Sequence, residues 1–195
     1  MLIEDETFTG DDWYAEEMED RAYVRCRFSD VDMTEATTRN TRFEECQFFN
    51  VRLNASRHED SALLRCELNR VNLFEAEFTG CKLTGSTFVD CALRPLTVTG
   101  GDWSFVNLVG ADLQGARITG VRMREADLTG VNLTDAVLAR TDLASATLTK
   151  LKLTRADLRG SDLSTLDILG SDVTGALIDA DQAITIALAL GLRVG

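Results

Sequence analysis

Large apolar residues recur at every fifth position along almost the whole chain. From Phe8 to Ile178, 33 of these 35 positions are apolar, and the two exceptions are Thr38 and His58. An α-helix needs a period near 3.6 and a β-strand a period of 2, so neither element alone produces a sustained period of five. The pattern instead predicts a solenoid in which each pentapeptide forms one side of a coil.

A second set of positions, two residues before each large apolar one, carries small side chains. From Cys26 to Ala176, 28 of 31 such residues are Ala, Cys, Ser, Thr, Val or Gly, and all five cysteines fall among them. We expect the large and the small residue of each pentapeptide to point inward and the other three to face solvent. Eleven of the 14 glycines occupy the fifth place, where glycine tolerates the positive φ that some tight corners require.

The residue before the large apolar one is often Asp or Asn. Pentapeptides such as those at 111–115 (ADLQG), 126–130 (ADLTG) and 156–160 (ADLRG) resemble the A(D/N)LXX consensus of the pentapeptide repeat family, over about residues 6–180. This resemblance implies an all-β fold, a right-handed quadrilateral parallel β-helix with four pentapeptides per coil. Nearly nine coils between residues 8 and 178, stacked at the ~4.8 Å spacing of strands, would form a rod about 40 Å tall.

The period stops after Ile178, which divides the chain into a repeat domain at 1–178 and a C-terminal segment at 179–195. In that segment Asp179 and Gln182 fit a helical capping box, and Gly191 fits the end of the helix. We expect this short α-helix to seal the strand edges of the last coil on one side and to meet a second copy on the other. The residues expected at this dimer interface are Ile184, Ile186, Leu188, Leu190 and Leu192.

Three features interrupt the regular pattern. Pro95 lacks the amide hydrogen of a ladder bond and therefore predicts a bulge or kink in the rod. Thr38 and His58 would stack in adjacent coils of four pentapeptides each, either tucked inward or flipped outward. The cysteines are expected to be free thiols that pack as small apolar groups. No metal or cofactor site is expected, because an isolated His lacks the company of other ligands.

Composition narrows the function classes. The chain has 20 Lys and Arg against 32 Asp and Glu, a net charge of −12, which argues against direct binding to nucleic acid. No apolar run approaches the length of a membrane span, and the acidic N-terminal stretch up to Asp20 does not resemble a secretory signal. We therefore expect a cytoplasmic protein that is soluble. A single His and no nucleophile–base pair argue against an enzyme.

Charge is distributed unevenly over the four expected sides. The side centred on Tyr23 and Phe43 has seven bases and six acids over residues 21–165, and the side centred on Phe8 and Phe28 has three bases and six acids. The remaining two sides have four bases against eight acids and five against nine. A narrow acidic rod has the shape and charge of a DNA duplex and would attract the basic groove of a DNA-binding protein. Residues 21–195 carry 23 acids and 20 bases, so shape supports this mimicry more than charge does.

Within the family, the chain resembles the MfpA/Qnr type of fluoroquinolone-resistance proteins. The shared features are the stretches at 91–97 (CALRPLT), 178–183 (IDADQA) and 191–192 (GL). This resemblance implies a homodimer that mimics DNA, binds DNA gyrase or topoisomerase IV, and protects it from quinolones or similar poisons. The contact candidates, which lie in the coils nearest the dimer junction, are Asp157, Asp162, Asp167 and Asp172. Because they are one pentapeptide apart, they fall on four different sides.

Two other functions stay open at this point. A structural or adaptor rod could bind some other protein, which would not be a topoisomerase, along one side. The other alternative is an enzyme, by analogy with left-handed β-helix acyltransferases, but those proteins repeat every six residues and use a His at a trimer interface. The period of five and the lack of a catalytic pair disfavour an enzyme.

Overall fold

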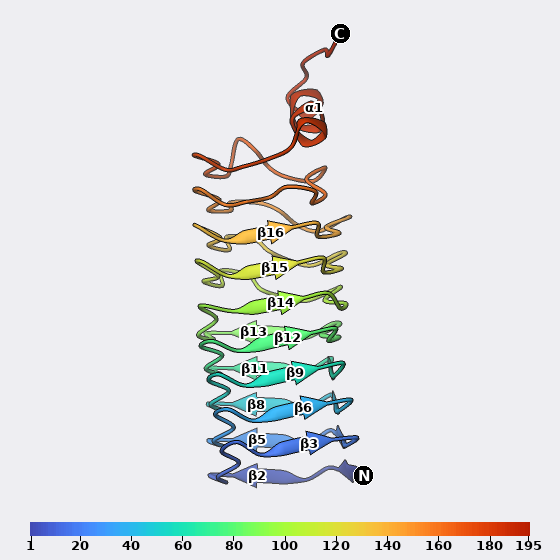
Figure 1. The fold of residues 1–195 in the computed structure, drawn as a ribbon, viewed down its shortest axis with the longest axis vertical. Coiled ribbons are helices and arrows are strands. Elements are labelled where there is room, and N and C mark those ends of the chain that lie inside the picture. Colours follow the sequence, from blue (N-terminus) through green and yellow to red (C-terminus); the bar gives the residue numbers. More distant parts are fainter.

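The computed structural model describes residues 1–195 as a rod of stacked coils with a helix at the C-terminal end (Figure 1). Strands pair in parallel with partners four pentapeptides further along the chain, as in Phe8 with Phe28 and Met18 with Thr38. Each coil therefore contains four pentapeptides. This register confirms the parallel, four-sided solenoid that the period of five and the family resemblance predicted.

We number the four sides in chain order, so that 1–5, 6–10, 11–15 and 16–20 begin sides 1 to 4, and each side recurs once per coil. Side 1 contains β1 (Leu2–Glu4), β4 (Ala22–Val24), β7 (Arg42–Glu44) and β10 (Ala62–Leu64). Side 2 contains β2 (Thr7–Thr9), β5 (Arg27–Ser29), β8 (Gln47–Phe49), β11 (Glu67–Asn69) and β13 (Thr87–Val89). Side 4 contains β3 (Glu17–Glu19), β6 (Thr37–Arg39), β9 (Arg57–Glu59), β12 (Glu77–Thr79), β14 (Thr97–Thr99), β15 (Arg117–Thr119) and β16 (Val137–Ala139). Side 3 has isolated parallel bridges and no named strand.

The corners between sides use a left-handed backbone at the fifth residue of nearly every pentapeptide. Glycine occupies some of these corners, but many other residue types also have positive φ there, among them Ala15 at 53° and Phe105 at 61°. Positive φ was expected at only some corners. Because the residues above and below each corner adopt the same conformation and pair with it, the stack imposes this backbone even where no glycine lowers its energetic cost.

A side-chain hydrogen bond distinguishes two kinds of pentapeptide. Where Asp or Asn precedes the large central residue, with the exception of Asp167, its Oδ1 accepts the backbone N–H two residues later, as Asn107 does from Val109 at 3.1 Å. This Asx turn favours a tight corner. None of the 16 strands begins with Asp or Asn. The residues that make this bond are Asp12, Asp32, Asn72, Asp102, Asn107, Asp112, Asp127, Asn132, Asp142, Asp157, Asp162 and Asp172.

The interior follows the inward positions that the sequence pattern predicted. One cluster of 48 buried residues runs through the rod. In its lower part aromatic rings stack from coil to coil, with Phe28 lying 5.0 Å from Phe8 and 4.8 Å from Phe48, centroid to centroid. Leucine fills most equivalent positions in the upper part, and all five cysteines are free thiols in the lower part. The Sγ atoms of Cys46 and Cys66 each donate to carbonyl oxygens of their own coil and the one below.

The helix α1 (Ala180–Ala189) begins with the predicted capping box. The side chain of Asp179 accepts the amide of Gln182 at 3.0 Å, and the side chain of Gln182 accepts the amide of Asp179 at 2.8 Å. The same Gln182 amide group is buried and donates to the carbonyl oxygens of Leu158 and Ser161. The start of the helix thus satisfies backbone groups at the edge of the last coils. No helix in the structure is long and apolar enough to cross a membrane.

Pro95 changes the ladder locally. The amide of Glu75 bonds to the carbonyl of Pro95 at 2.9 Å, whereas the equivalent amide one coil below, that of Ala55, bonds to Phe74, which precedes the corner. The acceptor has therefore moved by one residue at this corner. Two residues later, β14 pairs in regular register with both β12 and β15, so the irregularity is confined to the corner and the stack continues through it.

Candidate protein-binding surfaces

Ion pairs neutralise many carboxylates by bridging neighbouring coils. Arg25 binds Asp5 at 2.8 Å, and Arg155 binds Asp135 at 2.6 Å, each pair joining adjacent coils on the same side. The hydrogen bond from Arg155 lowers the pKa of Asp135, and the bond from Arg25 lowers that of Asp5. Such exposed pairs stabilise the fold little, but each of them places a cation beside a carboxylate that a partner would otherwise meet alone.

These ion pairs are absent from side 2. Side 1 has six, sides 3 and 4 have three each, and one more joins Arg21 of side 1 to Glu16 of side 4. Side 2 carries six acids, and none of them has an ion-pair partner. These acids are Glu6, Asp30, Glu67, Asp90, Asp127 and Asp167. The net charge of each side can be counted from the sequence, whereas the distribution of ion pairs depends on contacts between coils.

The predicted contact candidates have local hydrogen-bonding roles. Asp157, Asp162 and Asp172 each accept the amide two residues later in an Asx turn, and Asp167 accepts the amide of Gly170. Asp157 also pairs with Arg159 at 2.7 Å, and this bond lowers its pKa. Asp172 accepts hydrogen bonds from the hydroxyl and the amide of Thr174, which lower its pKa. The four residues lie on the four different sides, as their spacing predicted.

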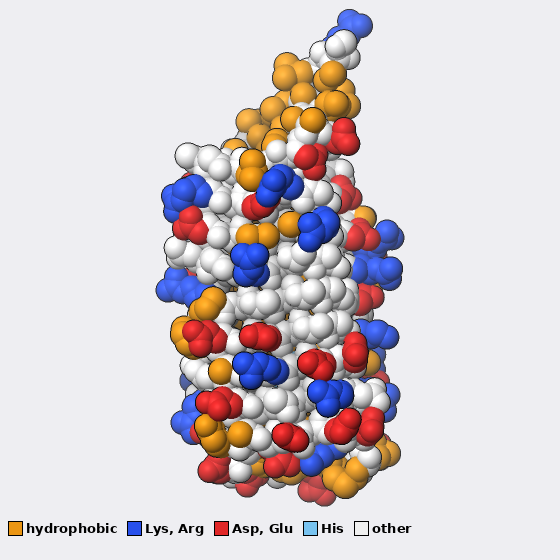
Figure 2. Space-filling view, in the orientation of Figure 1, with side chains coloured by type: hydrophobic (Ala, Val, Ile, Leu, Met, Phe, Trp, Pro, Cys, Tyr) orange, Lys and Arg blue, Asp and Glu red, His pale blue; other side chains and the backbone are white.

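The C-terminal end presents a second surface, which is apolar. Ile184, Leu188, Leu190 and Leu192 are 44%, 57%, 45% and 60% exposed, and Figure 2 shows the corresponding hydrophobic cluster over α1. Nearby Leu169 and Leu177 are exposed as well. Ile186 differs from the other four predicted interface residues because it is partly buried and packs against the core of the rod. It therefore belongs to the seal of the last coil, on the side of the helix that faces the rod.

The two polar exceptions to the apolar pattern both point inward. Thr38 and His58 stack in adjacent coils and are 2% and 4% exposed. The His58 ring lies between two hydroxyls, with Nδ1 2.8 Å from Thr38 Oγ1 and Nε2 3.0 Å from Ser56 Oγ, and it stacks on Phe78. Burial lowers the pKa of His58 to about 4, so the ring is neutral at pH 7. This arrangement satisfies a buried polar group and offers no accessible nucleophile.

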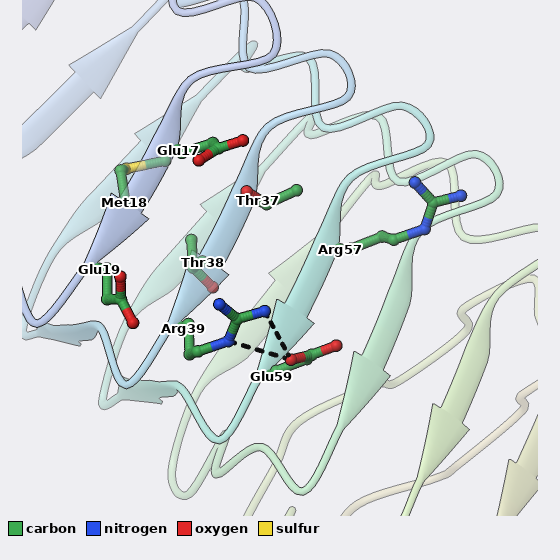
Figure 3. A pocket seen from close by; sticks show the side chains of 8 residues that line it. All are labelled: Glu17, Met18, Glu19, Thr37, Thr38, Arg39, Arg57 and Glu59. Atoms are coloured by element: carbon green, nitrogen blue, oxygen red, sulfur yellow. Dashed lines mark hydrogen bonds and ion pairs between the residues drawn. The ribbon is translucent and has the colours of Figure 1, made fainter.

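A shallow hollow of ≈ 270 Å³ lies outside this pair on side 4. Figure 3 shows that its side chains come from β3, β6 and β9, with Arg39 bound to Glu59 at 3.2 Å across two strands. Its floor is formed by Met18 and Thr38, whose side chains are buried, and its rim carries charges of both signs. No group of three or more His, Cys, Asp or Glu is arranged to hold a metal ion. Nothing in the hollow combines a nucleophile with a base.

The comparisons with known proteins agree with this geometry. The family profile "Pentapeptide repeat region" matches residues 71–148, the central part of a repeat that continues above and below it. The profile identifies a pentapeptide repeat region at these residues. Its sequence is similar to that of the pentapeptide repeat protein MfpA from Mycobacterium tuberculosis (strain ATCC 25618 / H37Rv), with 39% identity over 91 residues. That match covers 44% of this chain and 50% of MfpA, so it spans half the length of the relative.

Solved structures of the same fold cover this chain from end to end. A trypsin-treated QnrB1 variant, described as a plasmid-mediated fluoroquinolone resistance protein, matches with a TM-score of 0.77 at 20% identity. That match covers 100% of this chain and 98% of the other. Full-length QnrB1 matches with a TM-score of 0.52 at 18% identity, over 98% of this chain and 100% of the other. At these identities the likeness establishes the fold, including its extent.

Proposed function

We propose that this protein is a DNA mimic that binds DNA gyrase or topoisomerase IV and protects it from fluoroquinolones or similar poisons. The protein acts by occupying the site of duplex DNA and carries out no chemistry of its own. It does not bind nucleic acid directly, because its net charge of −12 repels phosphates. We expect it to act in the cytoplasm, where these topoisomerases work on chromosomal DNA.

The observation that carries the proposal is an acidic rod in a chain that is 39% identical to MfpA over 91 residues. The rod is narrow, and its coils repeat at the ~4.8 Å spacing of paired strands, so its carboxylates form vertical columns. A basic groove that is shaped to hold a duplex is attracted to such a surface by the same electrostatic steering that attracts DNA. The likeness to QnrB1, a plasmid-mediated fluoroquinolone resistance protein, supplies the fold on which the proposal rests.

We further infer a homodimer joined through the C-terminal helices. The exposed side chains of Ile184, Leu188, Leu190 and Leu192 support this inference, because apolar side chains gathered on one surface mark an interaction site. Two copies joined there would double the length of the rod. Asp157, Asp162, Asp167 and Asp172 would then lie near the junction, and they remain our candidates for contacts with the topoisomerase at that place.

The test is a DNA gyrase assay with purified protein. We expect the protein to inhibit ATP-dependent supercoiling, and to reduce the amount of cleaved DNA that a fluoroquinolone traps, at micromolar concentration or below. Charge reversal at Asp162 and Asp167 should weaken both effects if these residues touch the enzyme. A folded protein that leaves supercoiling and cleavage unchanged would contradict the proposal and favour a partner that is not a topoisomerase.

Leu188→Asp tests the dimer separately. We expect this variant to sediment as a monomer, because a carboxylate would be buried in an apolar interface. Phe105→Asp is the matched control, since Phe105 is also exposed and apolar, at 55%, but lies in the middle of the rod. If the unmodified protein sediments as a monomer at all concentrations, or if both variants dissociate alike, the dimer inference fails.

A further inference from the structure

Side 2 combines two properties that no other side shares. Its six carboxylates have no ion-pair partner, as described above, and its outward surface carries an uncharged column between them. Glu67 and Asp90 are exposed. In Figure 1 the strands of side 2 lie behind those of side 4, on the far side of the rod.

The three bases of side 2 do not neutralise these acids. The guanidinium of Arg70 lies over the ring of Phe49, with its carbon 4.3 Å from the ring centroid, and Arg27 donates to Ser29. Lys150 lies above the strands of this side and makes no ion pair. Three bases against six acids leave side 2 with a net charge of −3.

The uncharged column consists of the residue that follows the central apolar residue in each pentapeptide of side 2. Within it Val89 and Val109 occupy the same position in adjacent coils and are 36% and 49% exposed. Val109 also lines a pocket of ≈ 370 Å³ at the corner between sides 2 and 3, together with Phe88, Cys91 and Leu93. Asp90 and Asp112 line the same pocket, and because Asp112 is paired with Arg94, Asp90 supplies the unpaired carboxylate. An apolar hollow with an unpaired carboxylate at its edge is a site for an apolar side chain beside a cation.

We propose that side 2, from Glu67 to Val109, is a docking surface for a cationic segment of a protein that places an apolar side chain in the Val109 pocket. Lysine or arginine side chains of that segment bind Glu67 and Asp90. This inference deepens the proposed function by naming the side that faces the partner, and it rests on that function only for the partner's identity. A second copy of this chain does not fit, because two such faces would repel each other, and anionic membranes and nucleic acids are repelled in the same way.

A matched pair of triple variants tests the side directly. On side 2 we change Asp30→Asn, Glu67→Gln and Asp90→Asn. On side 4 we change Asp20→Asn, Glu17→Gln and Asp60→Asn, which alters the net charge equally. Each set contains one Glu that opens a strand and two Asp at positive-φ corners, and in each set one Asp accepts a bond from an Asn of the next coil. Circular dichroism and thermal melting establish that both sets fold like the unmodified protein.

The first probe is a synthetic peptide of about ten residues with alternating lysine and valine, titrated into the full-length protein by calorimetry at low salt. We expect the side 2 set to weaken binding roughly five-fold or more and the side 4 set less than two-fold, because local charge on the contacted face dominates such binding. Val109→Lys should weaken binding about as much as the side 2 set, whereas Thr134→Lys, at the same register position on side 3, should not. Equal losses from both sets, or no binding by the unmodified protein, would overturn the proposal.

The second probe is DNA gyrase, with the same variants in the supercoiling assay. A selective loss of inhibition in the side 2 set would show that this side faces the enzyme, and equal losses in both sets would overturn that assignment. If the unmodified protein has no effect on gyrase, the proposed function fails, while the peptide titration still decides whether side 2 binds cationic segments. The two failures are therefore distinguishable.

Discussion

The lower and upper coils build the same cross-section from different side chains. Residues 2–99 contain 14 of the 16 strands, β1 to β14, and the stacked columns of Phe and Tyr. Residues 100–178 contain only β15 and β16, and leucine dominates their interior. Both parts keep the same register from coil to coil, which isolated bridges carry from Val137 to Asp157 and on to Leu177.

The difference teaches that Asp or Asn before the central residue favours a turn over a strand, although pentapeptides such as those of Arg122 and Lys152 lack both the Asx turn and the strand. In the lower part Asp or Asn precedes the central residue mainly on side 3, which has no strand. In the upper part Asp and Asn occur at this position on all sides, and no pentapeptide that carries one forms a strand, as at Asn107 on side 2. The aspartate of the family consensus is therefore first a structural residue, which shifts attention to acids such as Glu67 and Asp90 for binding.

The largest expected effect comes from shortening the central residue on side 2 in each part. Phe28→Ala should lower the free energy of unfolding by about 3–5 kcal/mol, and Leu128→Ala by about 2–4 kcal/mol. Both side chains are fully buried. The loss for Phe28→Ala should exceed that for Leu128→Ala by about 1 kcal/mol, because Phe28 stacks between two rings. Urea denaturation measures both values.

Trp13 lies beside Phe28, and Trp103 lies in the upper part, beside Phe78. The fluorescence of each tryptophan therefore reports the unfolding of its own part of the rod. Since coils contact mainly their neighbours, the fluorescence of the nearer tryptophan should change at lower urea than that of the farther one. A larger loss for Leu128→Ala than for Phe28→Ala would show that the aromatic columns add nothing beyond burial.

The next largest effect is a dependence of stability on pH that arises from His58, in the lower part of the rod. Burial lowers the pKa of His58 from its ordinary value near 6.5 to about 4, so the unfolded chain binds a proton more readily than the folded one. The neutral His58 ring makes its full contribution to the free energy of unfolding above pH 6.5. This contribution is lost as the pH falls towards 4, and the loss is about 3 kcal/mol. His58→Gln keeps a polar side chain but cannot titrate.

The measurement is the free energy of unfolding against pH for both proteins. The unmodified protein should lose more stability than His58→Gln between pH 6.5 and 4, and the carboxylates that titrate in both proteins cancel in the difference. Parallel curves would mean that His58 is solvated or already protonated in the folded state.

The fold was predictable because every level of the sequence repeats. One spacing placed the large and small residues inward, and the resemblance to the family supplied four sides per coil; the pairing of strands in adjacent coils confirmed both. The helix was predictable from Asp179 and Gln182, whose capping box needs only local sequence. Ile186 packs against the core of the rod, a contact that the sequence did not reveal, because a short helix with apolar residues on several faces does not show which face the rod covers.

The candidate surface was less accessible to sequence reasoning. The net charge of each side could be counted from the sequence. Which carboxylates are neutralised depends on ion pairs such as that of Arg52 with Asp32, which come together only because the coils stack. Asp157 and its three companions were chosen for their position near the expected junction, and their backbone hydrogen bonds were not anticipated. The Asp or Asn before each central residue was visible throughout, and a test for Asx turns at that position would have separated structural from free carboxylates.

The smallest expected effect tests the Asx turn itself, on side 2. Asn107→Ala removes the side-chain acceptor for the amide of Val109 and should lower the free energy of unfolding by about 1 kcal/mol, as the loss of a helix cap does. Gln47 occupies the equivalent position at the start of β8, and Gln47→Ala should change stability by less than about 0.5 kcal/mol. Urea midpoints resolve this difference. If the two variants lose equal stability, the Asx turn follows from the stacking of the coils and does not determine the corner, and the contrast between the lower and upper coils would then arise from their core residues.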